Sequence, residues 1–356
     1  MAAHSQPLIR VVGSINVDFT TNTPRFPGPG ETLTATSFSV NAGGKGANQA
    51  VACGRASFAS QDKQDVRVEM IGAVGEGDHH YKALIEPTLR DAGVSCDGIT
   101  ETKGQTGTAT IIVDDGANGE NRILVVPGAN HDGMCQKEEI VARAFKDPQP
   151  QVIVLQGEIP QETVFAILDY SKSNLSAHNT KVVFNPAPVF EGGIPLKHLS
   201  QVDVLVMNET EVVQVLKGMP GKAAHWAGSL GGGLTLDRPN LEQISKLFHE
   251  AKVHTIIVTL GAQGVFYSRG CSESGLVPGI KVNKVVDTTA AGDTFVGRFA
   301  TALARWTGGS SGVITHDPAK EPPPFPIEEA IKAANAAAAK CVQRKGAMQS
   351  IPWGYE

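Results

Sequence analysis

The sequence has no long apolar run and no excess of positive charge, and these absences exclude two classes of partner. No stretch approaches the roughly 20 apolar residues that a membrane-spanning helix needs. The formal net charge is −5, so no overall positive field draws the chain to nucleic acid or to anionic lipid. We therefore expect neither a membrane nor a nucleic acid as a partner.

Cysteine is also scarce. The five cysteines are scattered along the chain and form no CxxC pair, which favours reduced thiols over a disulfide framework. The first ten residues, MAAHSQPLIR, lack the apolar core of a secretory signal peptide. These features predict a cytoplasmic protein, with the nucleus as an alternative location.

Two common nucleotide-binding motifs are missing. The segment AGGKGANQAVA (residues 42–52) is not a Walker A loop, because neither Ser nor Thr follows Lys45 and no glycine stands five residues before Gly44. No GxGxxG pattern occurs either, so the fingerprint of a Rossmann dehydrogenase is absent.

The composition is that of a globular protein of 356 residues, with 41% hydrophobic and 19% charged. Short β-branched runs alternate with segments of helical periodicity, which predicts a single α/β domain over residues 1–356, with a mostly parallel sheet and crossover helices. The predicted strands are residues 8–17, 151–156, 181–184, 202–207 and 254–260, and the predicted helices are residues 161–173, 208–217 and 239–251.

Two further segments, Glu31–Val40 and Thr106–Val126, alternate and are rich in Thr, Ile and Val, and the second contains the turn cluster DDGANGEN. They predict a small antiparallel lid, near residues 19–41 and 105–127, that closes over a site and excludes water. The stretches Gly218–Pro239 and Gly308–Pro326 are rich in glycine or proline and predict loop insertions.

The strongest local motif is DTTAAGD (residues 287–293), followed by the amphipathic segment TFVGRFATALARW. Ala290, Ala291 and Gly292 therefore stand at a helix start, where free N–H groups form an anion site. Asp293 lies in the first turn, where a carboxylate can accept a proton from an attacking hydroxyl. Taken alone, Asp293 is better explained as a residue that caps the helix or complements its dipole.

Two further motifs offer polar groups for a sugar. In AGGKGANQAVA, Gly44 and Gly46 allow close backbone approach, and Lys45 and Asn48 offer polar groups to hydroxyls. The alternative is a tight glycine turn with a solvated lysine. In GSINVD (residues 13–18), Asn16 and Asp18 point to the same side of a strand, although a polar strand end is common.

Two motifs favour a nucleotide. In NETE (residues 208–211), Asn208 and Glu211 fit a capping box, and the functional alternative is phosphate contact through Asn208 with Mg²⁺ near Glu211, held through water. In TLGAQG (Thr259–Gly264), two glycines at a strand end allow the backbone to pass close to a nucleotide. The alternative is an ordinary hairpin turn.

The segments GGKGANQAVA and DTTAAGDTF, in this order, together with NPAP, NETE, TLGAQG and RKGAMQSIPW, resemble the ribokinase-like family of carbohydrate kinases from about Ile9 to Trp353. The resemblance implies a ribokinase-like three-layer α/β fold with a small β lid, and a homodimer formed through that lid. It also implies transfer of the γ-phosphate of ATP to the 5-hydroxyl of D-ribose, with Mg²⁺ and K⁺ as cofactors.

The resemblance also implies roles for individual residues, with Asp293 as the catalytic base and Ala290–Gly292 as the anion hole. The implied sugar contacts are Asn16, Asp18, Gly44, Lys45, Gly46, Asn48, Glu158 and Asp293. The implied ATP contacts are Asn208, Thr259, Leu260, Gly261, Ala262, Gln263, Gly264, Gly292 and Asn335. The positions implied to surround a monovalent cation, mostly through carbonyl groups, are Asp287, Thr289, Cys341, Arg344, Gly346 and Ser350.

Two alternatives remain at this stage. One is a related kinase that acts on another sugar or on a nucleoside, although GGKGANQAVA favours ribose. The other is a catalytically silent sugar-binding or scaffolding protein on the same fold. The presence of Asp18, Gly292 and Asp293 argues against the silent protein.

Overall fold

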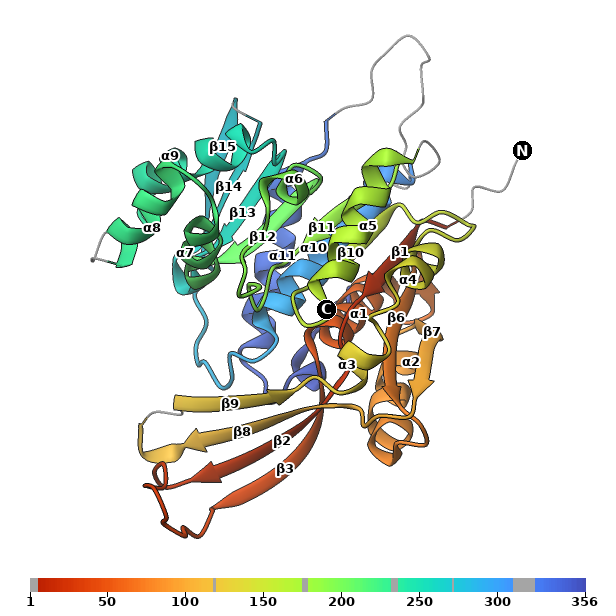
Figure 1. Ribbon diagram of the computed structural model, residues 1–356, viewed down its shortest axis with the longest axis vertical. Coiled ribbons are helices and arrows are strands. Elements are labelled where there is room, and N and C mark those ends of the chain that lie inside the picture. Colours follow the sequence, from red (N-terminus) through yellow and green to blue (C-terminus); the bar gives the residue numbers. More distant parts are fainter. Residues whose placement is uncertain (1–5, 118–119, 175–178, 232–235, 271, 310–323) are drawn as a thin grey trace.

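The computed structural model describes residues 6–117, 120–174, 179–231, 236–270, 272–309 and 324–356. A nine-stranded sheet lies between two layers of helices, and a four-stranded sheet projects from one end of this body (Figure 1). The mostly parallel α/β architecture predicted from the sequence is confirmed.

The central sheet is built from the β-branched runs of the sequence. Neighbouring strands pair in parallel, except β14, which is antiparallel to both of its neighbours. In spatial order the strands are β15 (Glu273–Pro278), β14 (Gly264–Arg269), β13 (Thr255–Thr259), β12 (Val204–Asn208), β11 (Lys181–Phe184), β10 (Val152–Leu155), β1 (Leu8–Val12), β6 (Arg67–Gly75) and β7 (Val94–Thr102).

Each face of the central sheet has its own apolar core, because successive side chains of a strand point to opposite faces. On β1, Ile9 and Val11 belong to one core, and Val12 belongs to the other. The first core is closed by α1 (Lys45–Ala56), α2 (Glu86–Asp91), α10 (Ala291–Thr307) and α11 (Ile327–Cys341). The second is closed by α3 (Ala129–Asp132), α4 (Lys137–Ala144), α5 (Gln161–Ser173), α6 (Leu196–Leu199), α7 (Glu209–Gly218), α8 (Lys222–Gly231) and α9 (Arg238–Glu250).

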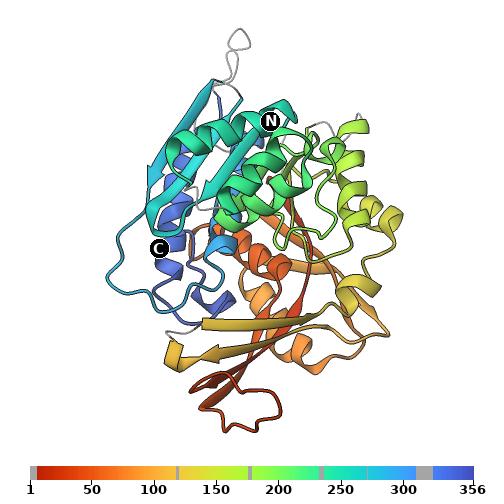
Figure 2. The same ribbon diagram turned by 60° about the vertical axis from the view of Figure 1, so that its left-hand side comes forward.

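The small sheet has the spatial order β3 (Ser37–Gly43), β2 (Asn16–Thr23), β8 (Gly107–Asp114) and β9 (Glu120–Val126). It lies at one end of the body in both ribbon views (Figures 1 and 2). Strands β2 and β8 pair in parallel, whereas the outer two pairings are antiparallel. A hairpin of β4 (Phe58–Ser60) and β5 (Lys63–Gln64) forms a third, two-stranded sheet.

The structure corrects three sequence predictions. The predicted strand over residues 8–17 is two strands in different sheets, because the chain leaves the central sheet after Val12 and Asn16 begins β2. The strand predicted over Glu31–Val40 begins only at Ser37. The predicted loop Gly218–Pro239 contains helix α8, which buries Ala223 and Ala227 four residues apart against the second core.

The second predicted insertion, Gly308–Pro326, lies mostly outside the described residues, which resume at residue 324. Within the described part of the chain, no helix combines the length and apolar character that crossing a membrane requires.

Candidate active site

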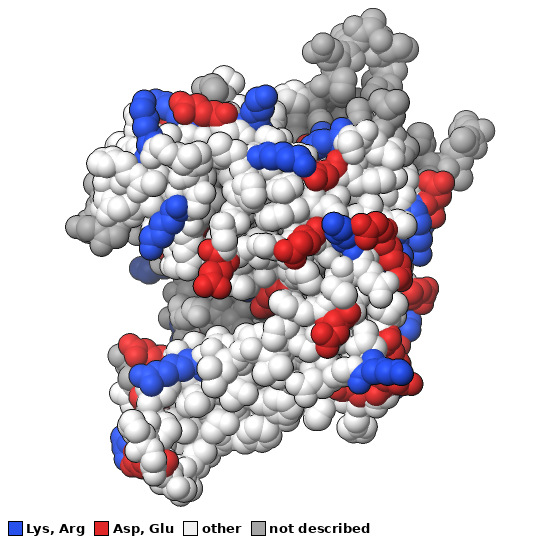
Figure 3. Space-filling model, in the orientation of Figure 1, with Lys and Arg blue, Asp and Glu red and all other residues white. Residues whose placement is uncertain are grey.

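A cavity of about 190 Å³ lies at the carboxyl ends of β11, β12 and β13 and at the start of α10, which is where parallel α/β sheets bind ligands. It brings together predicted sugar contacts and predicted nucleotide contacts. Its lining comprises Lys45, Asn185, Val206, Met207, Asn208, Glu211, Thr259, Thr288, Ala290, Gly292, Asp293 and Val296. Figure 3 shows a hollow between the body and the small sheet, with acidic side chains along its edge.

Asp293 is only 7% exposed, in the first turn of α10. Its Oδ2 accepts a hydrogen bond from Asn48 Nδ2 at 3.1 Å, and its Oδ1 accepts one from Gln49 Nε2 at 3.0 Å. Both donors stand on α1, which packs closely on α10 because Gly297 leaves no side chain between them; a Cβ there would lie 2.4 Å from that of Ala52. The carboxylate is therefore held at both oxygens.

The start of α10 faces the cavity. Ala290 has a left-handed backbone conformation with φ of 60° and precedes the first helical residue. Ala291 N donates to Thr288 O at 3.3 Å. Within the described residues, the amides of Gly292 and Asp293 have no protein acceptor, and no atom lies within 4 Å of a Cβ built on Gly292. This helix start can therefore present N–H groups to an anion.

Lys45 supplies the positive charge of the cavity. Burial opposes its charged form, but the carboxylates of Asp293, Glu158 and Glu211 together hold the pKa of Lys45 above its usual value. Glu158 Oε2 accepts from Lys45 N at 2.8 Å and from Ser14 Oγ at 2.5 Å. Lys45 therefore remains protonated beside three carboxylates.

The glycines next to Lys45 are required by close backbone approach. Gly44 has a φ of 88°, and a Cβ on it would lie 2.7 Å from Asn16 N. A Cβ on Gly46 would lie 2.4 Å from Ser14 N, and Gly46 N donates to Ser14 Oγ at 3.1 Å. Both positions therefore accept only glycine without a shift of the backbone.

Asn16 and Asp18 stand on β2 of the small sheet. Burial raises the pKa of Asp18 to about 7, and the nearby charges of Glu158 and Asp293 add to the effect. Asn16 Oδ1 accepts from Asn130 Nδ2 at 2.7 Å, which leaves the amide NH₂ of Asn16 as its remaining polar group.

The predicted nucleotide residues are divided between the cavity and a hairpin. Asn208 and Glu211 form a capping box at the start of α7, as one interpretation of NETE expected, and burial raises the pKa of Glu211. Thr259 lines the cavity, whereas Leu260, Gly261, Ala262, Gln263 and Gly264 form the turn between β13 and β14. Asn335 on α11 donates to Pro278 O at 3.2 Å, and Pro278 is the strand partner of Gly264.

Most of the predicted cation positions lie together. The Asp287 carboxylate accepts from Thr289 N and from Gly346 N, each at 2.9 Å, so it joins two loops. Cys341 Sγ contacts Thr289 O at 3.6 Å and Ser350 Oγ at 3.0 Å. The Arg344 side chain instead pairs with Glu356 at the end of the chain.

Metal ligation by side chains finds no support in the described residues, where no group of three or more His, Cys, Asp or Glu could hold a metal ion.

Four buried amides near the site were missed by sequence reasoning: Gln49, Asn130, Gln156 and Asn185. Asn130 Oδ1 accepts from Ile15 N at 2.8 Å, and the other three amides bond to one another. The available signal was a polar residue inside an otherwise apolar segment, as in QVIVLQ and GANQAVA.

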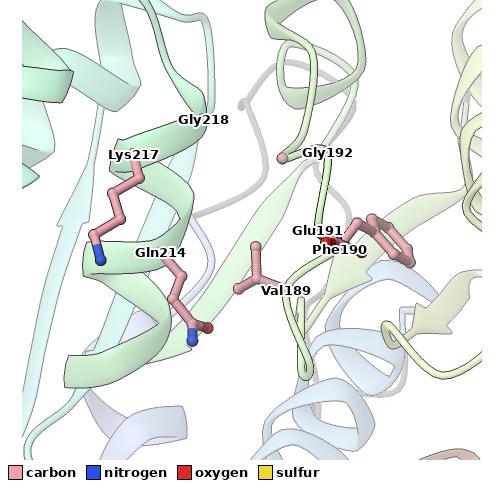
Figure 4. Close-up of a pocket in the computed structure, with 8 residues that line it drawn as sticks. Val189, Phe190, Glu191, Gly192, Gln214, Lys217 and Gly218 are labelled. Atoms are coloured by element: carbon pink, nitrogen blue, oxygen red, sulfur yellow. The ribbon is translucent and has the colours of Figure 1, made fainter.

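Larger hollows lie on the two flanks of α7. One, of about 420 Å³, lies between Gln214 and Lys217 of the helix and the loop Val189–Gly193 (Figure 4). The other, of about 430 Å³, is lined partly by Leu230 and Leu236. The charged side chains of the first hollow, Glu191 and Lys217, are exposed to solvent. The candidate site is therefore chosen for its buried charges and free N–H groups and not for its volume.

The fold is that of a kinase acting on carbohydrates. The chain belongs to the pfkB family of carbohydrate kinases, whose sequence pattern matches residues 6–354. This confirms the class of enzyme and the family expected from the sequence.

Similar proteins are known from several organisms. The chain is 35% identical over 349 residues to the ribokinase of Schizosaccharomyces pombe, a match that covers 97% of this chain and 94% of that protein. It is 33% identical over 296 residues to the deoxyribokinase of Salmonella typhi, covering 82% and 84%. The structure of Arabidopsis thaliana ribokinase complexed with ribose and ATP aligns with a TM-score of 0.73 at 29% identity, covering 98% and 96%.

Proposed function

We propose that this protein transfers the γ-phosphate of ATP to the 5-hydroxyl of D-ribose, giving D-ribose 5-phosphate and ADP. The observation that carries the proposal is the placement of Asp293 and the free N–H groups at the start of α10 in one cavity with Lys45. Full-length similarity to a ribokinase, and to a ribokinase that binds ribose and ATP, supports the choice of substrates.

In the proposed mechanism Asp293 is the general base. Its Oδ2 accepts the proton as the sugar oxygen forms its bond to the γ-phosphorus and the bond to the β,γ-bridging oxygen breaks. The N–H groups of Ala290, Ala291 and Gly292 form the anion hole for the transferring phosphoryl group, with Ala291 N giving up its 3.3 Å bond to Thr288 O. Protonated Lys45 adds positive charge. Most of the catalysis is therefore positioning and electrostatic stabilisation.

We assign the sugar to the groups between α1 and β2. Asn16 donates its NH₂, whereas the carboxylates of Asp18 and Glu158 accept from hydroxyls. Asn48 Oδ1 is buried and has no hydrogen-bond partner among the residues that the structure describes, so it can accept from the sugar. Gly44 and Gly46 complete this assignment by letting the backbone approach the ligand.

ATP is assigned to the opposite side of Asp293. Asn208 contacts phosphate, and Gly292 contacts the γ-phosphate. The turn Thr259–Gly264 and Asn335 face the adenine ring. The Glu211 carboxylate is already occupied by Asn208 N at 2.9 Å and Asn185 Nδ2 at 3.3 Å. Such a carboxylate fits Mg²⁺ held through water, which Mg²⁺ retains readily; the ion would offset phosphate charge.

We assign K⁺ to the two loops joined by Asp287, with carbonyl oxygens as its main ligands. Carbonyls suit a large, weakly hydrated cation better than Mg²⁺. The role of this chain in that site is to fix the backbone immediately before Ala290, and so to align the N–H groups of the anion hole.

The small sheet is proposed to act as a lid and as the contact of a homodimer. Strand β9 is an edge strand with every residue exposed, including Ile123, Leu124, Val125 and Val126. An exposed apolar edge is a ready contact for a second copy. The free thiols fit a reducing compartment, so the cytoplasm is the proposed location and the nucleus stays a prediction.

The test is consumption of ATP with a panel of pentoses, 2-deoxyribose, hexoses and nucleosides. A strong preference for ribose supports the proposal. A preference for 2-deoxyribose or another acceptor favours the related kinase, for which similarity to a deoxyribokinase is the specific argument. Binding of ribose without turnover would favour the silent protein.

A further inference from the structure

Asp293 is attached to a chain of buried amides that extends away from the cavity. Gln156 Nε2 donates to Gln49 Oε1 at 2.8 Å, and Gln49 Nε2 donates to Asp293 Oδ1 at 3.0 Å. Gln49 and Gln156 are both 0% exposed. Gln49 Nε2 also reaches Asn185 Oδ1 at 3.1 Å.

The direction of the Gln49 amide follows from its partner, because the carboxylate oxygen of Asp293 accepts a hydrogen bond and only the NH₂ of Gln49 can donate one. The NH₂ of Gln156 faces Gln49 Oε1, so Gln49 has only its own NH₂ to turn toward Asp293. A flip of Gln49 would place its oxygen against the carboxylate and its NH₂ against that of Gln156. The Oε1 of Gln156 lies beside Gly13, where a Cβ would be 1.9 Å from it, and among the described residues it has no hydrogen-bond partner.

The chain continues to the second carboxylate of the cavity. Asn185 Oδ1 is taken by Gln49, so its Nδ2 donates to Val206 O at 3.0 Å and to Glu211 Oε2 at 3.3 Å. Two amides therefore lie between Asp293 and Glu211. Gln49 donates to the carboxylate of Asp293, and Asn185 donates to that of Glu211.

We propose that Gln49 is a positioning residue for the catalytic base: it holds Oδ1 of Asp293 in the protein interior and so directs Oδ2 to the sugar hydroxyl. The inference rests on the proposed function, in which Asp293 is the base. A base whose rotation is fixed before the substrate binds has less to reorganise during the reaction. Asn48 holds Oδ2 but is also a sugar contact, so only Gln49 acts on the base alone.

The alternative is that Gln49 merely fills the core between α1 and α10. The two readings predict different kinetics. Loss of a core residue lowers stability and the amount of active enzyme. Loss of a positioning residue lowers kcat while the Michaelis constants for both substrates change little.

The decisive variant is Gln49→Met, which keeps the length of the side chain and removes the donor. Hydrogen bonds to charged groups are the stronger ones, so we expect kcat to fall about ten- to a hundredfold. The KM values for ribose and ATP should stay within about threefold. Ser171→Ala is the matched control: Ser171 is a fully buried polar residue that bonds only within α5, and its loss should leave kcat unchanged.

Gln156→Met provides a second, independent variant. It leaves Gln49 in place but removes the donor to Gln49 Oε1, so the Gln49 amide can rotate. We therefore expect a smaller loss of kcat, about three- to tenfold, again without a change in KM. Thermal melting of each variant, with rates per folded enzyme, removes the contribution of stability.

The outcomes distinguish the positioning role of Gln49 from the role of Asp293 as the base. Turnover within twofold of the wild type in both glutamine variants, or a loss that lies in KM, would overturn the positioning role. Asp293→Asn is measured alongside: if it keeps near-normal turnover, the proposed mechanism fails. If it is inactive while Gln49→Met is unimpaired, only the inference about Gln49 fails.

Discussion

Replacement of Asp18 by Asn should stabilise the ligand-free protein at alkaline pH while damaging its use of the sugar. The pKa of Asp18 is raised from 3.8 to about 7, chiefly by burial and further by Glu158 and Asp293. Between these two values the folded protein holds a proton that the unfolded chain has lost. Stability must therefore fall as pH rises through this range, and the loss is complete above pH 7.

The magnitude follows from the pKa. From pH 5 to the folded pKa of about 7 is roughly two units, and at 1.36 kcal/mol for each unit the wild type loses up to about 3 kcal/mol of stability. The unfolding entropy of 356 residues is about 0.75 kcal/mol/K. The Tm advantage of Asp18→Asn over the wild type should thus grow by about 2–4 °C between pH 5 and pH 8.

The assay is thermal unfolding without ligands from pH 5 to pH 8.5, for the wild type, for Asp18→Asn and for Asp62→Asn. Asp62 is an exposed carboxylate in a surface turn, so its variant should follow the wild-type curve. Titration of ribose by calorimetry then measures the cost to binding, which should be about 1–3 kcal/mol for a lost partner. Parallel Tm curves for Asp18→Asn and the wild type would refute the burial argument.

Three further results are expected. Asp293→Asn should lower kcat about a hundred- to ten-thousandfold with ribose and ATP binding retained by calorimetry; near-normal turnover contradicts its role as base. Asn130→Leu should raise the KM for ribose about tenfold and leave that for ATP unchanged, because Asn130 orients Asn16; equal effects on both substrates would argue for general damage. In potassium-free buffer with excess Mg²⁺, added K⁺ should raise kcat, and Asp287→Ala should weaken that response; a flat response in both proteins removes the cation site.

Local sequence patterns were sufficient for much of the fold and for part of the site. The β-branched runs predicted strands β10, β11, β12 and β13 because a strand buried on both faces must be continuously apolar. The capping box at Asn208 was also predictable, since its donors and acceptors lie within four residues. The position of Asp293 at a helix start followed from the periodicity of the segment after it.

The remainder depended on contacts between distant segments. Gln49 and Asp293 are 244 residues apart in the chain, and Asn130 and Asn16 are 114 apart. A polar residue inside an apolar segment, as Gln49 is in GANQAVA, indicates a buried amide but does not identify its partner. The break after Val12 was missed for a similar reason, because Gly13 is set by its packing on Gln156 and by its bond to Ile71 O at 3.1 Å.

The passage of the chain from β1 to β2 has a mechanical consequence. Three residues, Gly13 to Ile15, are all that separate β1 of the nine-stranded sheet from the strand of the small sheet that carries Asn16 and Asp18. Lys45 and Asp293 belong to the body. A sugar that contacts Asn16 and Asp18 on the small sheet and Lys45 and Asp293 on the body would therefore link the two parts. Binding of the sugar would then restrict the movement of the small sheet relative to the body.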